Sequence, residues 1–202
     1  YGFQPLTEMA KDNEVPGSKI IAAINGDFFN ATTGEPTGVY YLNGKGLKTT
    51  IPTAGGTFFS IYEDKSMVIG GKDAAGLLRP VDYTKIKYAV GGRQWLVDKG
   101  VKVNNTDVTI DARTAIGFTS DKVVYSVVVD GGRIDYSNGM SLANLSEVMA
   151  SFGVADAINL DGGISSSAVV RDGANAKWNL LNRPTAAKGR SVANGLGFVL
   201  KD

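Results

Sequence analysis

Three apolar runs of the chain end in polar residues that could do chemistry. INLDGGISSS at 158–167 passes from apolar residues to Asp161, two glycines and three serines, and VVVDGG at 127–132 repeats the carboxylate with two glycines. A third run, AAIN at 22–25, leads through one glycine into Asp27. Glycines behind a carboxylate let the backbone approach a ligand closely and aim N–H groups at an anion, and serine hydroxyls add donors. These segments therefore predict carboxylates beside a cradle for a phosphate or an oxyanion, formed by Gly162, Gly163, Ser165 and Ser166.

Four further polar residues stand next to apolar runs and are candidate substrate contacts. Asn159 lies inside an apolar run, where an unpaired amide is costly, and Asn25 holds the equivalent position before Asp27. Arg113 in RTAIGF and Arg190 in GRSVANGLGF precede apolar runs, and the planar guanidinium group suits a phosphate or a carboxylate. Each has an ordinary structural alternative, because asparagines also bond within sheets, arginines are mostly solvated, and Asp-Gly is a common turn. The residues alone leave both interpretations open.

The composition excludes several kinds of chemistry. The chain has no cysteine, which excludes a thiolate nucleophile and a disulfide, and no histidine, which is the usual general base at neutral pH. Acid and base catalysis must therefore use carboxylates, tyrosine, lysine or bound water. With 21 Lys and Arg against 20 Asp and Glu, and no basic block, nucleic acid is not expected as a partner. The sequence contains no run of about 18 apolar residues, so insertion into a membrane is not expected.

The elements that must position these residues can be outlined from the apolar pattern. The 202 residues suffice for one domain with a sizeable core, and the glycines are spread along the chain, so we expect a single domain over 1–202. Residues 6–14 predict a short helix, and 19–24 a buried strand. Between 40 and 103, short β-rich runs alternate with turn signals such as NGKG and DKG. This middle region therefore predicts antiparallel hairpins.

The second half of the chain predicts a strand, a helix and a strand in succession. KVVYSVVVD at 122–130 is the strongest strand signal, Ser141 caps an amphipathic helix, and another strand follows at 157–160. The apolar face of the helix is formed by Leu142, Leu145, Val148, Met149 and Phe152. Parallel strands would bring Asp130 and Asp161 to the same sheet edge. The expected fold class is α+β, with mixed β-sheets and a few packed helices, including this strand–helix–strand unit at about 122–161.

Six segments, taken together and in this order, resemble the phosphodiester glycosidase family: INGDFF, RTAIGF, VVVDGGR, SLANLSEVMASFG, AINLDGGISSS and GRSVANGLGF. The resemblance covers nearly the whole chain and is weakest between about 40 and 108. It implies a single hydrolase domain that cleaves a sugar 1-phosphodiester between the anomeric carbon and the phosphate, with no required cofactor. A bacterial or phage origin and an extracellular, cell-envelope or virion-associated location are expected. The partner is then a carbohydrate or sugar-phosphodiester substrate, such as a surface glycan or a teichoic-acid-like polymer, and the oligomeric state is unspecified.

The resemblance also suggests roles for the candidate residues. Asp161 would lie nearest the anomeric carbon, and Asp27 would be its partner in acid–base work. Arg113, Arg190 and the Gly162 to Ser166 loop would hold the phosphate. The two asparagines, Asn25 and Asn159, would position sugar hydroxyls or the carboxylates, while Asp130 is a secondary candidate.

Two other functions remain open at this stage. Asp27, Asp130 and Asp161 could instead be hard oxygen ligands for Ca²⁺ or Mg²⁺ in a phosphodiesterase that breaks the P–O bond. Alternatively, the chain could be a carbohydrate-binding module of a phage tail or cell surface that lacks catalysis. The second hypothesis rests on Ile164, which stands where the family commonly has a third glycine.

Overall fold

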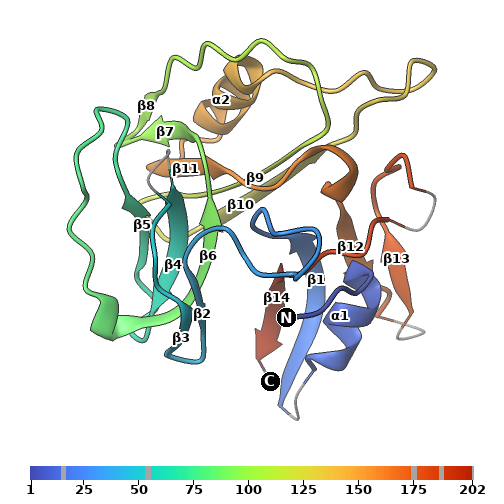
Figure 1. Ribbon diagram of the computed structural model, residues 1–202, viewed down its shortest axis with the longest axis horizontal. Helices are drawn as coiled ribbons and strands as arrows, with labels where there is room; N and C mark the ends of the chain where they lie inside the picture. The colour runs from blue at the N-terminus through green and yellow to red at the C-terminus, as the bar shows by residue number, and fades with distance from the viewer. Residues whose placement is uncertain (15–16, 53–55, 174–176, 187–188, 202) are drawn as a thin grey trace.

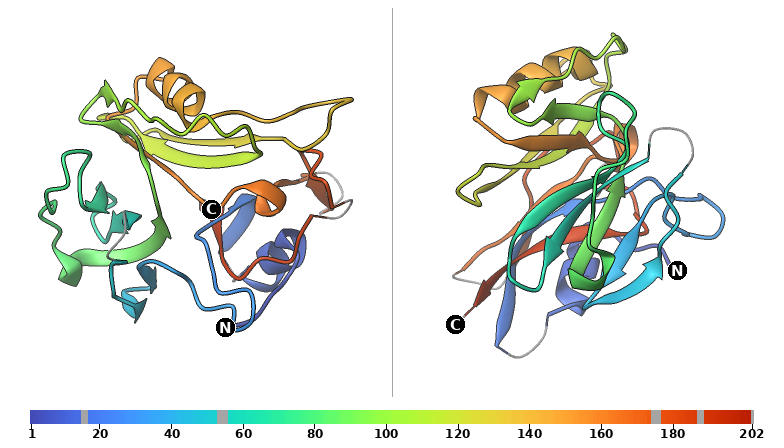
Figure 2. Two further views of the ribbon diagram at one scale, coloured as in Figure 1. Left: turned by 45° about the horizontal axis from the view of Figure 1, so that its top comes forward. Right: turned by 90° about the vertical axis from the view of Figure 1, so that its left-hand side faces the viewer.

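Three antiparallel sheets make up most of the protein and surround a common centre (Figures 1 and 2). The computed structural model describes residues 1–14, 17–52, 56–173, 177–186 and 189–201. Within these residues the fold is mostly β, with two short α-helices and two single-turn 3-10 helices, and no helix is long and apolar enough to cross a bilayer. The predicted α+β class is consistent with this content, although the helices contribute little of it.

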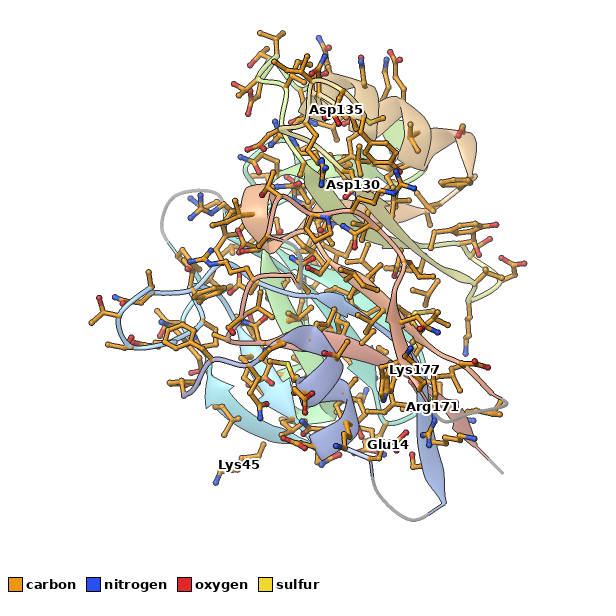
Figure 3. The ribbon with its side chains drawn as sticks, turned by 90° about the vertical axis from the view of Figure 1, so that its right-hand side faces the viewer. Glu14, Lys45, Asp130, Asp135, Arg171 and Lys177 are labelled. Carbon is orange, nitrogen blue, oxygen red and sulfur yellow. The ribbon has the colours of Figure 1, made fainter. Side chains whose placement is uncertain are left out.

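The first sheet combines the first strand of the chain with its last three strands. Its order is β13 (Trp178–Leu180), β12 (Ala168–Arg171), β1 (Ser18–Asn25) and β14 (Gly195–Lys201), and α1 (Leu6–Asp12) covers one face. The predicted helix at 6–14 and strand at 19–24 are thus confirmed, with ends displaced by one or two residues. Apolar residues of α1, β1 and β12 pack together. Arg171 of β12 also pairs with Glu14 just beyond α1 (Figure 3), so the helix is tied to the sheet.

The second sheet carries the helix that the sequence places after Ser141. Its order is β10 (Val124–Val129), β9 (Arg113–Phe118), β11 (Asp156–Asn159), β7 (Trp95–Asp98) and β8 (Val101–Lys102). Helix α2 (Leu142–Ser151) lies over one face, and its N–H at Asn144 donates to the Ser141 hydroxyl at 3.1 Å. Leu142, Leu145 and Met149 are buried against this sheet.

The two strands on either side of α2 run in the same direction but do not pair. β10 and β11 each pair antiparallel with β9, which lies between them. Both strands therefore end at the same edge of the sheet, as the sequence predicts for Asp130 and Asp161. Two strand spacings put those ends about 10 Å apart, so the two carboxylates share an edge without being neighbours.

The third sheet is formed from the predicted hairpin region. Its order is β3 (Lys45–Lys48), β2 (Tyr40–Leu42), β6 (Ile86–Gly92), β4 (Thr57–Tyr62) and β5 (Met67–Gly71), and every pairing is antiparallel. A 3-10 turn at Tyr83–Lys85 leads into β6. The antiparallel prediction for this region is confirmed.

The main core fills the space where the three sheets meet. Its buried residues come from all three: Ile24, Phe59, Ile69, Val90, Trp95, Ile116, Phe118, Ile158 and Leu160. Burying such side chains contributes about 1.5–3 kcal/mol each, so this cluster holds the sheets together. β1, β6 and β11 all contribute to it, and their carboxyl ends are consequently fixed relative to one another. The polar turns predicted to do chemistry follow those ends.

Candidate active site

Two carboxylates follow the ends of strands from different sheets. Asp27 comes two residues after β1 and is 2% exposed, and Asp161 comes two residues after β11 and is half-buried. The Asp161 N–H donates to the Gly26 carbonyl at 3.0 Å, which joins the two turns directly. The first and second sheets therefore contribute one carboxylate each to a common site.

Asn25 holds these turns together through its side chain. Its Nδ2 donates to the Asp161 carbonyl at 2.7 Å. Its Oδ1 accepts from the Thr114 hydroxyl at 2.8 Å and from the Ser167 N–H at 3.1 Å. Because Asn25 is 1% exposed and its amide is bonded to three segments, it positions the site. The sequence left open whether this amide contacts substrate, and the geometry supports the positioning role.

Asp27 lies in a tight pocket of backbone. Its Oδ2 accepts from the Gly38 N–H at 2.6 Å, and a Cβ at Gly91 would lie only 2.4 Å from the same oxygen. Burial raises the pKa of Asp27 to about 7, against hydrogen bonds from the Gly38 and Phe28 N–H groups and the charge of Arg93, which lower it. The neighbouring Asp161 charge raises the pKa further. Asp27 can therefore carry a proton near neutral pH.

Asp161 has a different environment. Burial raises its pKa too, but a hydrogen bond from Ser165 and the charge of Arg190 both favour its ionised form. Arg190 also donates from Nη1 to the Ser165 hydroxyl oxygen at 3.0 Å. The two carboxylates thus meet different partners, and such a pair divides naturally into a proton donor and an anion.

Two arginines flank the carboxylates, each over an aromatic ring. The guanidinium carbon of Arg190 lies 4.8 Å from the ring centre of Phe29, and that of Arg93 lies 3.8 Å from the ring centre of Phe28. Both arginines lower the pKa of Asp161. Cation–π contacts of this kind hold a guanidinium in place without neutralising it. The site is therefore cationic at its rim and acidic at its centre.

The glycine–serine loop uses most of its N–H groups to hold its own shape. Gly163 N–H donates to the Ala112 carbonyl at 2.8 Å, and the Ser165 and Ser166 N–H groups donate to Gly162 and Gly163 carbonyls at 3.1 Å. The loop forms one 3-10 turn, Gly163–Ser165, with Gly163 at φ 57°. These N–H groups do not form the anion cradle that the sequence suggested. The loop contributes side chains instead, and Ser165 is the one that contacts both Arg190 and Asp161.

Ile164 does not distort this loop. Its backbone is not in the left-handed region, which favours glycine, and its side chain is 54% exposed. A glycine is therefore not required at this position. Ile164, on which the hypothesis of a non-catalytic binding module rests, therefore fits the observed turn.

Arg113 does not join the carboxylate pair. Its Nε donates to the Met140 carbonyl at 2.9 Å and its Nη2 donates to the Thr109 carbonyl at 2.5 Å. The side chain is 9% exposed and holds two loops beside β9. Thr114, the next residue, instead points to Asn25. The phosphate role suggested for Arg113 has no support in this geometry.

Asp130 stabilises the serine loop indirectly, through Asn182. Its carboxylate accepts from Asn182 Nδ2 and from the Arg183 N–H, both at 2.8 Å. Asn182 Nδ2 also donates to the Ser166 carbonyl at 3.0 Å. Figure 3 places Asp130 at the base of the loop that carries Asp135. Asp130 therefore supports the site through Asn182, and a direct contact with substrate is not needed to explain it.

Asn159 and two serines keep unused polar atoms at the site. Asn159 Nδ2 donates to Gln94 Oε1 at 3.2 Å, while its Oδ1 has no partner among the described residues. The Ser166 and Ser167 hydroxyls are also buried without a partner in the described part of the chain. Buried polar atoms normally find a bonding partner. Each of these three buried groups retains bonding capacity that a buried water could use.

The described residues do not gather the carboxylates that a metal site needs. No group of three His, Cys, Asp or Glu side chains in this part of the chain could hold a metal ion. The metal-dependent alternative requires Asp130 beside Asp27 and Asp161, but the Asp130 carboxylate is bonded elsewhere. The donor set for Ca²⁺ or Mg²⁺ is thus incomplete.

The sequence did not identify three residues that shape the site. Arg93 follows the two glycines that end β6, and Gly91 leaves room for the Asp27 carboxylate. Asn194 accepts the Asp27 N–H through Oδ1 at 2.6 Å. The only signal for Arg93 was its place after an apolar run ending in two glycines. Its nearness to Asp27 depends on how separate sheets pack, which this pattern does not encode.

Comparisons with known proteins agree with the fold and the motifs. A family model described as "Phosphodiester glycosidase" matches residues 18–199. N-acetylglucosamine-1-phosphodiester alpha-N-acetylglucosaminidase of Mus musculus is 28% identical over 181 residues, covering 79% of this chain and 33% of that protein. The chain thus spans about a third of the length of this curated relative.

Two solved structures share the fold. The zebrafish N-acetylglucosamine-1-phosphodiester alpha-N-acetylglucosaminidase catalytic domain, auto-inhibited by its pro-peptide, matches with a TM-score of 0.68 and 24% identity, covering 99% of this chain and 67% of that one. A hypothetical protein from Synechocystis matches with a TM-score of 0.63 and 14% identity, covering 99% and 54%. Since the family model spans almost the entire sequence, from β1 to β14, the chain belongs to the phosphodiester glycosidase family.

Proposed function

We propose that this protein is a hydrolase that cleaves the C–O bond between the anomeric carbon of a sugar and a phosphodiester. The observation that carries the proposal is the pair Asp27 and Asp161, which have different protonation environments and are flanked by Arg93 and Arg190. The name of the mouse relative supplies the first substrate to try, an N-acetylglucosamine 1-phosphodiester.

The two carboxylates divide the work of breaking this bond. Asp161, whose ionised form is favoured by the Ser165 hydrogen bond and the Arg190 charge, faces the anomeric carbon and stabilises the positive charge that develops there. Asp27, protonated near neutral pH, donates its proton to the bridging oxygen as the C–O bond breaks. Water then attacks the anomeric carbon, and its proton returns to the Asp27 carboxylate. The products are a free sugar and a phosphomonoester.

Arg93 and Arg190 supply positive charge that offsets the repulsion between the substrate phosphate and the two carboxyl groups. Arg93 lowers the pKa of both carboxylates and is exposed, so its guanidinium can reach the phosphate of the leaving group beside Asp27. Arg190 is half-buried and bonded to Ser165, so it acts on the Asp161 side. An envelope glycan with sugar-phosphate links would be such a substrate. The bacterial or phage origin and the extracellular, envelope or virion location stay predictions.

The direct test is release of free sugar from N-acetylglucosamine 1-methylphosphate, with and without EDTA. We expect release that resists EDTA and falls by about 10²–10⁴-fold in Asp161→Asn. Asp135→Asn, an exposed carboxylate on the loop after β10, is the matched control and should retain full activity. Equal activity of Asp161→Asn and the control would contradict the proposal. Activity abolished by EDTA and restored by Ca²⁺ or Mg²⁺ would favour the metal-dependent phosphodiesterase.

A further inference from the structure

A cleft of about 650 Å³ opens beside the carboxylate pair. Its volume lies within the roughly 300–1,000 Å³ range of small-molecule sites. Arg93 and Gln94 line it, and these residues also belong to the site: Arg93 acts on both carboxylates, and Gln94 accepts a hydrogen bond from Asn159. The cleft is therefore continuous with the site at its Arg93 side.

One end of the cleft lies next to the segments that enclose Asp27. Two of its lining residues, Thr37 and Gly92, are the chain neighbours of Gly38 and Gly91, which enclose the Asp27 carboxylate. Asp161, by contrast, is held from the other side by Ser165 and Arg190, which are not among the lining residues. In the proposed reaction Asp27 protonates the leaving oxygen, so the leaving group extends toward this cleft.

The cleft has a positive character. Arg93 and the exposed Lys72 both line it, and within the described residues neither makes an ion pair. Its acidic lining residue, Asp73, uses Oδ1 to accept the Ala75 and Leu77 N–H groups at 3.0 and 2.9 Å. One carboxylate oxygen is thus committed to its own turn. Two cations against one anion leave the described lining with a net positive charge that would attract an anionic ligand.

The wall that carries Lys72 is fixed in place before any ligand binds. Trp95 Nε1 donates to the Lys72 carbonyl at 2.5 Å, and the guanidinium carbon of Arg79 lies 4.2 Å from the Trp95 ring centre. Arg79 in turn pairs with Asp98 and with Asp156, the latter at 2.7 Å. This largely buried cluster joins the Lys72 wall to β7 and β11. A preformed wall lowers the ordering cost of binding.

We propose that this cleft is a leaving-group subsite, and that the substrate carries a second phosphate beyond the one that is cleaved, held by Lys72. The inference rests on the proposed function and adds the substrate class: a chain of repeating sugar-phosphate or polyol-phosphate units, cut at a sugar 1-phosphate link. Arg93 would contact the scissile phosphate at the inner end of the cleft. Lys72 would contact the next phosphate along the chain, over the Trp95 wall.

The test compares two substrates, of which only one carries a second phosphate. Both are N-acetylglucosamine 1-phosphodiesters, one esterified to glycerol 3-phosphate and the other to glycerol 3-methyl ether. We expect the wild type to prefer the phosphate-bearing substrate by about three- to tenfold in kcat/KM, mainly through KM, and the preference to shrink as salt is added. Lys72→Ala should abolish the preference, and Lys72→Arg should retain most of it.

Lys45→Ala is the matched control, because Lys45 is an exposed lysine on β3 at the opposite end of the molecule from Asp130 (Figure 3). It should keep the preference of the wild type. If the wild type hydrolyses both substrates equally well, or if Lys72→Ala keeps the preference, the subsite is refuted while the proposed function stands.

A second arm separates failure of the subsite from failure of the proposed function. If the wild type hydrolyses neither substrate nor N-acetylglucosamine 1-methylphosphate, the proposed function fails on these sugars. Calorimetry then measures the binding of glycerol 1,3-bisphosphate and tests the cleft without any hydrolysis. Binding to the wild type and Lys45→Ala that weakens several-fold in Lys72→Ala supports the anion subsite. Equal binding by all three, or none, overturns it.

Discussion

Replacing Asp27 with asparagine should make the protein more stable at pH 8 and almost inactive. Asparagine keeps the shape of the side chain and can still accept the Gly38 N–H, but it cannot ionise. Burial raises the Asp27 pKa from 3.8 to about 7 in the folded protein. Since a tenfold change in an equilibrium constant corresponds to about 1.4 kcal/mol, the difference between these two pKa values means that ionising the buried group costs the native state about 4 kcal/mol.

The sign of this effect follows from which state holds the proton. Between the unfolded pKa near 3.8 and the folded value of about 7, the native state keeps the Asp27 proton and the unfolded state has lost it. The free energy of unfolding therefore falls as pH rises through this window and levels off above it. Asp27→Asn lacks this contribution, so its stability should fall less between pH 4 and pH 8 than that of the wild type.

Urea unfolding of both proteins at several pH values from 4 to 8 measures the difference. We expect the stability of Asp27→Asn relative to the wild type to rise by about 2–4 kcal/mol over this range, because other groups titrate alike in both proteins. Release of sugar should fall by about 10²–10⁴-fold, and the decline of wild-type activity above about pH 7 should disappear. Identical pH dependence of stability in the two proteins would show that Asp27 is not protonated in the native state.

Three further substitutions test other parts of the site. Gly91→Ala places a Cβ 2.4 Å from Asp27 Oδ2 and should reduce activity at least tenfold, whereas Gly173→Ala, with open space around it, should leave activity unchanged; equal kinetics would contradict the packing. Arg93→Ala should raise the pKa of Asp27 and shift the alkaline limb of the pH–rate profile upward while increasing KM; an unmoved limb would remove Arg93 from the site. Asp130→Ala should lower the free energy of unfolding by about 1–3 kcal/mol, measured in urea, while its activity stays resistant to EDTA. Loss of activity without loss of stability would imply that Asp130 contacts the substrate.

The positions of both central carboxylates could be predicted because the signal is local. Asp27 and Asp161 each lie two residues after the end of a buried strand, and each has a glycine next to it. This pattern marks a loop at a sheet edge. The helix after Ser141 and the hairpins between 40 and 103 were equally readable from apolar periods and turn residues. These features depend on neighbours within a few residues.

The surroundings of Arg113 and Arg93 could not be predicted, because they depend on side-chain direction and sheet packing. Arg113 and Thr114 are adjacent in β9, and adjacent side chains in a strand point to opposite faces. Thr114 therefore reaches Asn25 at the site, while Arg113 bonds to loop carbonyls on the other face. The run RTAIGF does not reveal which face meets the first sheet. Arg93 was missed for the same reason, since its nearness to the carboxylates results from the packing of three sheets.

The bond that is broken tests the central claim most directly. Hydrolysis of N-acetylglucosamine 1-methylphosphate in ¹⁸O-labelled water, followed by mass spectrometry of both products, shows which atom the water attacks. The Asp27 and Asp161 pair acting at the anomeric carbon predicts that the label enters the sugar. Label in the methyl phosphate would mean attack at phosphorus and would contradict a glycosidase.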